Sequence, residues 1–77
     1  MKETLEYILR NIVNYPEEVA IDEREEAGKT ILTVRVNKED MGKVIGKQGR
    51  IIRAVRDLIK LIATKRNIFV DVVLIEE

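Results

Sequence analysis

The sequence contains no cysteine and no histidine, and it also has no serine. Without cysteine the protein can form neither a disulfide bond nor a thiolate metal site, and nothing points to an oxidising compartment. The missing side chains include the commonest general base and the commonest nucleophiles of enzymes. A metal site would need carboxylates alone, and no suitable spacing of Asp and Glu is present. We therefore expect no enzyme activity, no metal and no cofactor.

Long apolar runs are also absent. The N-terminal segment MKETLEYILRN carries charged residues among its apolar ones, so it fits neither a signal peptide nor a membrane span. A cytoplasmic protein is expected. The chain has 77 residues, of which 45% are hydrophobic and 36% are charged, and this length allows one core only. We predict a single ordered domain over residues 1–77.

Charge is abundant and unevenly placed along a chain whose net charge is zero. Residues 1–37 hold five Lys and Arg against eight Asp and Glu, a net charge of −3. Residues 38–66 hold nine basic against three acidic residues, a net charge of +6, and residues 67–77 hold three acidic residues only, giving −3. A basic middle segment in a neutral chain is typical of a local anion-binding surface, which the overall charge would hide.

The N-terminal segment predicts an amphipathic helix. Its apolar residues are spaced three and four positions apart, which places them on one stripe of a helix. These residues are Leu5, Ile8, Leu9, Ile12 and Val13. We expect Pro16 to end the helix, because the residue before a proline disfavours helical geometry.

Two strands are expected next. The segment EEVAIDEREE alternates around Val19 and Ile21 and then becomes acidic. This pattern predicts an edge strand that frays into a polar hairpin end, with Gly28 in the turn. The segment TILTVRV, residues 30–36, is rich in β-branched residues and predicts a more regular strand. One face of that strand would hold Leu32, Val34 and Val36.

A short helix is expected after Asn37, which is a candidate N-cap for the segment KEDMGKVI. Glu39 and Asp40 would lie in its first turn, where the helix dipole favours negative charge. Gly42 and Gly46 would keep the helix short.

A longer helix from about Gly49 to Thr64 and a final strand complete the chain. The apolar residues of the helix are again spaced by three and four: Ile52, Val55, Leu58, Ile59 and Ile62. The opposite side carries Arg53, Arg56 and Lys60. The segment NIFVDVVLIEE alternates, which predicts a strand with one buried face. That face would hold Ile68, Val70, Val72 and Leu74.

The order helix, strand, strand, helix, helix, strand predicts an α+β domain with a three-stranded mixed sheet and helices packed on one face. The first two strands can pair antiparallel as a hairpin. The two helices between the second and third strands return the chain, so that pair should be parallel.

The segment VIGKQGR, residues 44–50, places two glycines around a lysine and a glutamine where the long helix begins. Glycine lets a ligand approach the backbone, and the first N–H groups of a helix favour a phosphate. The P-loop motif does not fit, because only three residues separate Gly42 from Gly46 and glutamine follows Lys47. The dinucleotide motif G-x-G-x-x-G also fails, because Val44 stands where it needs a glycine.

The segment VIGKQGRII resembles the I-G-x-x-G signature of the KH domain, an RNA-binding module whose GXXG loop clamps about four nucleotides. The order of elements is similar to the bacterial, type II arrangement of that family, and the resemblance covers the whole chain. The chain most resembles the small stand-alone bacterial KH proteins. The resemblance therefore implies a protein that binds single-stranded RNA, with an RNA-chaperone role as a further implication.

The resemblance also implies roles for particular residues. The phosphates would lie against the loop residues Gly46, Lys47, Gln48 and Gly49, and Ile45 would help to floor a groove for unstacked bases. Further RNA contacts would come from Lys43, Arg50 and Arg53. No aromatic residue lies near this loop in the sequence, so we expect weak binding with little sequence preference.

Plainer interpretations remain open beside these. Gly46 and Gly49 would also suit a tight turn between two helices. For Arg56 and Lys60 we favour a simple solvent-exposed helix face. The stand-alone relatives are thought to dimerise, in part with a larger KH-containing protein. Pairing with a second copy or with such a partner is therefore the alternative function.

Overall fold

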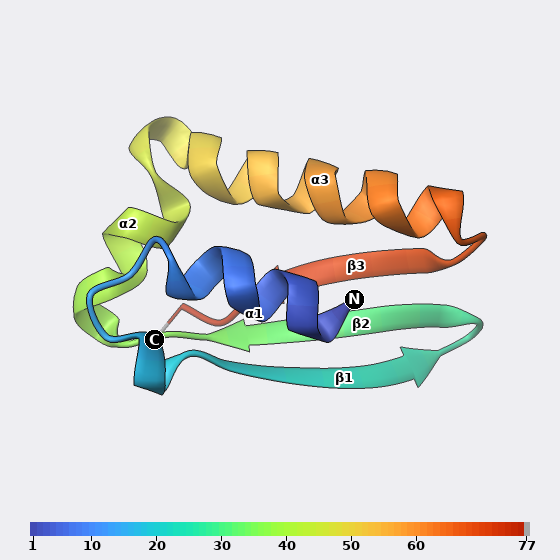
Figure 1. The fold of residues 1–77 in the computed structure, drawn as a ribbon, viewed down its shortest axis with the longest axis horizontal. Helices are drawn as coiled ribbons and strands as arrows, with labels where there is room; N and C mark the ends of the chain where they lie inside the picture. The colour runs from blue at the N-terminus through green and yellow to red at the C-terminus, as the bar shows by residue number, and fades with distance from the viewer. Residues whose placement is uncertain (77) are drawn as a thin grey trace.

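The structure is a computed structural model that describes residues 1–76. Its elements follow the predicted order of helix, strand, strand, helix, helix, strand (Figure 1). None of the helices described over residues 1–76 is long and apolar enough to cross a membrane. The elements are α1 (Lys2–Arg10), the 3-10 turn η1 (Pro16–Glu18), β1 (Ala20–Glu26), β2 (Lys29–Arg35), the 3-10 turn η2 (Lys38–Asp40), α2 (Met41–Ile45), the 3-10 turn η3 (Lys47–Gly49), α3 (Arg50–Lys65) and β3 (Phe69–Leu74).

The sheet has the predicted mixed topology. Its strand order is β1-β2-β3, with β1 antiparallel to β2 and β3 parallel to β2. The β-branched residues of β2 suit an extended backbone, and this strand lies in the middle of the sheet. Leu32 of β2 lies opposite Val72 of β3, and Val34 lies opposite Ile21 of β1. All four side chains are buried, so one face of the sheet forms the core.

The β1–β2 hairpin is paired up to its turn, which corrects the expected fraying. The ladder continues through the acidic segment to Glu26, which lies opposite Lys29. Gly28 lies in the turn as predicted, together with Ala27, and their φ angles are 79° and 51°. Positive φ at both central residues is typical of a type I′ turn, whose twist matches that of two antiparallel strands. The turn therefore keeps the charged end of β1 in the sheet.

The two longer helices bury apolar stripes against the inner face of the sheet. Figure 1 shows α1 and α3 both running roughly along the direction of the strands, with α3 beside β3. The predicted stripe of α1 is represented in the core by Leu5 and Leu9. The core residues of α3 are Ile52, Val55, Ile59 and Ala63.

Leu58 is not a core residue, contrary to the prediction. Its side chain is 44% exposed, whereas Ala63, one position after the predicted Ile62, is almost fully buried. Ile51 and Leu61 are also exposed, at 37% and 62%. Residues 51, 58 and 61 lie on one side of the helix and residues 52, 55 and 59 on another. We call Ile51, Leu58 and Leu61 the outer stripe of α3.

Helix α1 ends at Arg10, well before Pro16, and this also corrects the prediction. The chain leaves the helix through a turn in which Ile12 and Val13 donate backbone hydrogen bonds to the Leu9 carbonyl at 3.0 and 3.2 Å. The backbone N–H groups of Asn14 and Tyr15 then donate to the two carboxylate oxygens of Asp40, each at 2.9 Å. The Asp40 side chain is fully buried. The chain therefore leaves the helix before Pro16, and a tertiary contact with Asp40 holds the segment in between.

Candidate nucleic-acid interface

The loop between α2 and α3 begins at Gly46, where the backbone geometry requires glycine. Gly46 has φ 76° and ψ 174°, and its N–H donates to the Gly42 carbonyl at 2.9 Å. A Cβ atom on Gly46 would lie 2.5 Å from Cγ1 of Ile51. Both the positive φ and this close approach exclude a larger residue. Gly46 therefore ends α2. Gly42 was also expected to shorten this helix, but it lies inside α2 and does not end it.

The tip of the loop is formed by Lys47 and Gln48, whose side chains are exposed. Gln48 and Gly49 both have positive φ, at 57° and 73°. The loop is closed by a hydrogen bond from the Gly49 N–H to the Gly46 carbonyl at 3.1 Å. This tight turn brings the two glycines together and directs the tip away from the core.

The start of α3 lacks the features that usually neutralise a helix N-terminus. Gly49 is the N-cap residue, no side chain caps the helix, and its first turn has no acidic residue. The turn η2 differs, because the Asn37 side chain accepts a hydrogen bond from the Glu39 N–H at 2.7 Å and two acidic residues follow Asn37. The Asn37 cap was predicted. The positive end of α3 is thus open to an anion.

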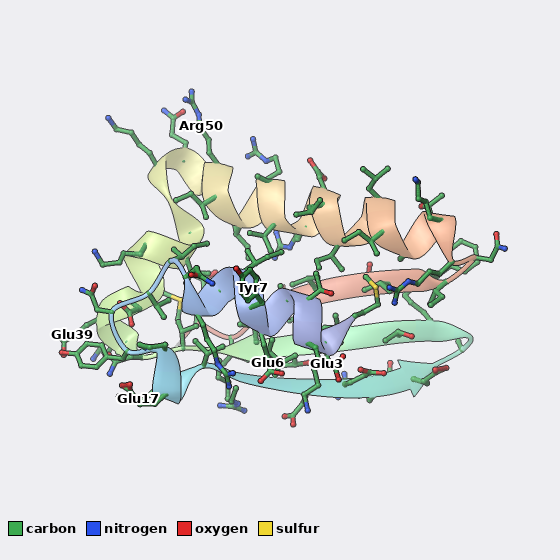
Figure 2. The ribbon with its side chains drawn as sticks, viewed as in Figure 1. Glu3, Glu6, Tyr7, Glu17, Glu39 and Arg50 are labelled. Carbon is green, nitrogen blue, oxygen red and sulfur yellow. The ribbon has the colours of Figure 1, made fainter. Side chains whose placement is uncertain are left out.

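Basic side chains surround this open helix end. Lys43, Lys47 and Arg50 are exposed, and in the structure of residues 1–76 they form no side-chain hydrogen bond or ion pair. Figure 2 shows Arg50 projecting outward from the loop end of α3, while Glu3, Glu6 and Glu17 lie on the other side of the molecule. Arg53 turns back toward the loop, with Nη2 3.5 Å from the Gln48 carbonyl oxygen. Within residues 1–76, the loop therefore presents positive charge that no acidic side chain neutralises.

Apolar residues support the loop from below. Val44 is fully buried and anchors α2 in the core, whereas Ile45 is only half-buried. Ile51 packs under Gly46 and is partly exposed. The contact between Gly46 and Ile51 was not predicted, since the sequence shows only that an apolar residue follows the loop. Ile45 and Ile51 provide apolar surface beside the loop.

The outer edge of β3 lies next to α3. The Ile75 N–H donates to the Val34 carbonyl at 2.9 Å, so the odd-numbered residues of β3 direct their backbone groups toward β2. The even-numbered residues face outward, and the Val72 carbonyl accepts a hydrogen bond from Nε of Arg56 at 3.1 Å. Arg56 is half-buried, so our expectation of a simple solvent-exposed residue is wrong for it. Arg56 holds α3 against the edge of β3.

The geometry thus combines a basic GXXG loop, an uncapped helix N-terminus and a neighbouring strand edge. A family model for the KH domain of KhpA and KhpB matches residues 2–74. The chain belongs to this KH-domain family. The match covers every helix and strand, including the loop.

Curated relatives agree with this assignment. The chain is 44% identical over 77 residues to the RNA-binding protein KhpA of Chlamydia pneumoniae, which covers 100% of the chain and 99% of the relative. It is 47% identical over 74 residues to KhpA of Thermotoga maritima, covering 95% and 99%. It is 49% identical over 67 residues to KhpA of Clostridium acetobutylicum, covering 87% and 89%.

Proposed function

We propose that the protein binds single-stranded RNA by holding its phosphates against the GXXG loop, Gly46–Gly49. The observation that carries this proposal is the uncapped, acid-free start of α3 directly behind a loop whose basic side chains form no ion pair within residues 1–76. Membership of the KhpA/KhpB family supports it, because the curated relatives are named RNA-binding proteins. A type II KH arrangement, a single domain over residues 1–77 and a cytoplasmic location belong to the same proposal.

Each predicted site residue has a role in this proposal. Lys43, Lys47 and Arg50 provide charge for the phosphates, and the exposed amide of Gln48 provides hydrogen-bond donors. Arg53 supports the loop through the Gln48 carbonyl and reaches the same backbone. Ile45 and Ile51 pack against bases.

The proposed binding is weak and has low sequence preference. Phosphate contacts carry no sequence information, and no aromatic ring lies in the loop to stack on a base. Contacts of this kind release RNA readily, as an RNA chaperone requires, so we include a chaperone role in the proposal.

Binding of fluorescent single-stranded RNA by the native protein and by the double variant Lys47→Asp, Gln48→Asp tests the proposal. We expect the variant to lose binding, because the change places negative charge where the phosphates lie. Circular dichroism should remain unchanged, since both side chains are exposed and Asp tolerates the positive φ of position 48. Equal binding by both proteins, or no binding by either, would refute the loop as an RNA clamp.

The single variants Lys47→Asp and Lys38→Asp form a matched control. Each lysine is exposed and begins a 3-10 turn, and each substitution changes the net charge by the same amount. Only Lys47→Asp should weaken RNA binding strongly. An equal loss in both variants would show that overall charge, and not the loop, controls the affinity.

Pairing with a second copy of the chain is the alternative function, and the outer stripe of α3 favours it. Ile51, Leu58 and Leu61 are exposed apolar residues at spacings of seven and three. With the exposed Ala54 they follow the three-and-four spacing of a helix-pairing seam. A larger KH-containing protein would be accommodated by the same face. Pairing would also strengthen RNA binding, because two weak sites act together on one strand.

Light scattering at micromolar concentration tests the pairing proposal. We expect a dimer for the native protein and a monomer for the variant Leu58→Glu, Leu61→Glu, because charge in an apolar seam opposes association. The variant should still bind short RNA through the loop. A native protein that stays monomeric at these concentrations would exclude self-pairing.

A further inference from the structure

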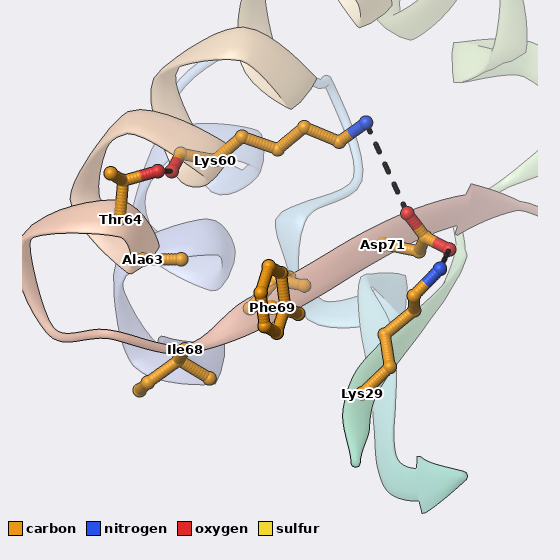
Figure 3. Close-up of a pocket in the computed structure, with 8 residues that line it drawn as sticks. Lys29, Lys60, Ala63, Thr64, Ile68, Phe69 and Asp71 are labelled. Atoms are coloured by element: carbon orange, nitrogen blue, oxygen red, sulfur yellow. Dashed lines mark hydrogen bonds and ion pairs between the residues drawn. The ribbon is translucent and has the colours of Figure 1, made fainter. Parts of the chain in front are cut away.

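A cavity of about 220 Å³ lies at the end of α3 that is remote from the GXXG loop. It opens between the last turns of α3 and the first residues of β3, with one side chain from the start of β2 (Figure 3). None of the site residues discussed above lines it. Its lining residues are Lys29, Lys60, Ala63, Thr64, Ile68, Phe69, Val70 and Asp71.

Two lysines extend from opposite sides of this cavity toward one carboxylate. Nζ of Lys29 lies 3.2 Å from Oδ2 of Asp71, and Nζ of Lys60 lies 3.9 Å from Oδ1 (Figure 3). The three side chains have a net charge of +1, and all of them remain accessible to solvent. The cavity therefore offers positive charge for a phosphate and a carboxylate acceptor for an amino group.

Phe69 is an exposed aromatic residue at this cavity. Its side chain is 74% exposed, which is unusual for phenylalanine, a residue more often buried in the core. Phe69 lies on the outer face of the sheet, opposite Lys29 in the parallel ladder. A ring that leaves most of its surface in water gains by stacking against a flat partner, and a nucleobase provides a flat face of matching size.

The cavity and the loop lie at the two ends of one helix. Helix α3 begins at Arg50, directly after the loop, and Lys60 and Thr64 lie about 15 and 21 Å further along its axis at 1.5 Å per residue. The outward edge of β3 runs beside the helix between the two ends. A single strand that is held at the loop and follows α3 toward its C-terminus would reach Phe69.

We propose that this cavity is a second nucleobase site, which takes one nucleotide of the same RNA strand beyond the segment held by the loop. The base stacks on Phe69, and Lys60 and Lys29 lie beside the adjoining phosphate. Asp71 accepts a hydrogen bond from the amino group of adenine, cytosine or guanine, a group that uracil lacks. The inference rests on the proposed RNA binding at the loop, and it adds the one aromatic contact that the loop does not have.

RNA length separates the two sites. Oligonucleotides of four nucleotides fill the loop, whereas those of about eight to twelve also reach the cavity. The variant Phe69→Ala should bind the short RNA like the native protein and bind the longer RNA about five- to tenfold more weakly, the low end for stacking of one base. Phe69→Tyr should restore the affinity. A longer RNA offers more positions at which the protein can bind, which raises the apparent affinity. This effect is the same for all variants, because they are compared at equal RNA length.

Tyr7 provides the matched control. Its ring is 72% exposed, almost the same fraction as that of Phe69, but it lies on α1. Tyr7→Ala should leave the binding of both RNA lengths unchanged. A direct readout is available because the chain has no tryptophan. Fluorescence of Phe69→Trp should be quenched by the longer RNA and not by the four-nucleotide RNA, while Tyr7→Trp should respond to neither.

Failure of this inference is distinguishable from failure of the proposed function. The second site would be refuted if Phe69→Ala and the native protein had equal affinities at every RNA length. If Lys47→Asp lost all binding in the same experiment, the loop proposal would remain in place. Absence of RNA binding by the native protein would refute both. Light scattering compares the molar mass of Phe69→Ala with that of the native protein. A different molar mass with unchanged RNA affinity would assign Phe69 to a contact between copies and would refute the second site.

Discussion

At the scale of single residues, the glycines of this chain have different tasks. Gly46 has positive φ and lies against Ile51, whereas Gly42 has an ordinary helical position with no atom close to where a Cβ would lie. The sequence indicates that a glycine pair forms the loop. It does not show which glycine is sterically required, because that depends on where Ile51 packs.

The variants Gly46→Ala and Gly42→Ala should therefore change stability in opposite directions. Gly46→Ala should lower the free energy of unfolding by at least about 2 kcal/mol, because it adds strain at positive φ and a clash with Ile51. Gly42→Ala should raise it by about 0.5 to 1 kcal/mol, because alanine favours the helix. Urea unfolding of both variants measures these changes, and similar destabilisation by both would contradict the assigned roles.

Asp40 is a second residue whose task is tertiary. The sequence places it in the first turn of a helix, and the helix dipole was the expected reason for an acidic residue there. In the structure its carboxylate binds the backbone N–H groups of Asn14 and Tyr15 and joins the segment after α1 to the start of α2. No local pattern in the sequence indicates this contact, because the partners are 25 and 26 positions away.

Asp40→Asn should destabilise the protein by about 2 to 3 kcal/mol, because an amide NH₂ would face a backbone N–H where a charged acceptor is now buried. The expected fall in melting temperature is about 10 to 20 °C for a domain of this size. Glu39→Gln is the control, since Glu39 is the exposed neighbouring acid. Thermal unfolding followed by circular dichroism measures both, and equal melting temperatures for native protein and Asp40→Asn would show that the contact contributes little.

At the scale of elements, spacing predicts where helices and strands lie better than it predicts which face is covered. The long helix was expected near residues 49–64 and spans Arg50–Lys65. Its apolar residues belong to two stripes, one in the core and one exposed, and the sequence alone does not separate them. Leu58 was assigned to the core for this reason. The edge strand was expected to fray because its side chains are acidic, yet its backbone pairs to the turn.

The type I′ turn of the hairpin contains a residue, Ala27, whose replacement by asparagine should stabilise the protein. Ala27 has φ 51°, a conformation that costs most residues with a Cβ atom about 1 kcal/mol or more, while asparagine adopts it readily. Ala27→Asn should raise the free energy of unfolding by about 0.5 to 1 kcal/mol. Ala27→Val should lower it, because a β-branched residue is strained at positive φ. Guanidinium unfolding distinguishes the two, and an increase in stability for valine would contradict the observed turn.

At the scale of the whole molecule, a net charge of zero conceals a basic region and a separate acidic region. Most of the basic residues lie between Lys43 and Arg66, in the loop and along α3. The acidic residues Glu3 and Glu6 of α1 lie on the other side of the molecule from Arg50 (Figure 2).

The basic middle segment was visible in the sequence. The sequence also indicated that Lys43, Lys47 and Arg50 lie near the start of the long helix. The contact of Arg53 with the Gln48 carbonyl was not visible, because it depends on the turn between α2 and α3.

RNA affinity should therefore follow local and not overall charge. We expect the logarithm of the binding constant to fall with the logarithm of salt concentration by about 0.7 for each phosphate contact. Lys47→Gln should reduce this slope by about 0.7, since it removes one contact. Glu23→Gln raises the net charge by one but lies on β1, and it should leave the slope unchanged. Equal changes of slope in both variants would show that the overall charge, and not the charge at the loop, controls RNA affinity.

The parallel pairing of β2 with β3 has a consequence for how the protein is made. During synthesis the β1–β2 hairpin leaves the ribosome before β3, so β2 has no partner on its other side until Phe69–Leu74 has been translated. At about 5 to 20 residues per second, the interval from Arg35 to Leu74 lasts about 2 to 8 s. Throughout that time the middle strand of the finished sheet is an unpaired edge, and the acidic strand beside it provides like-charge repulsion between nascent chains.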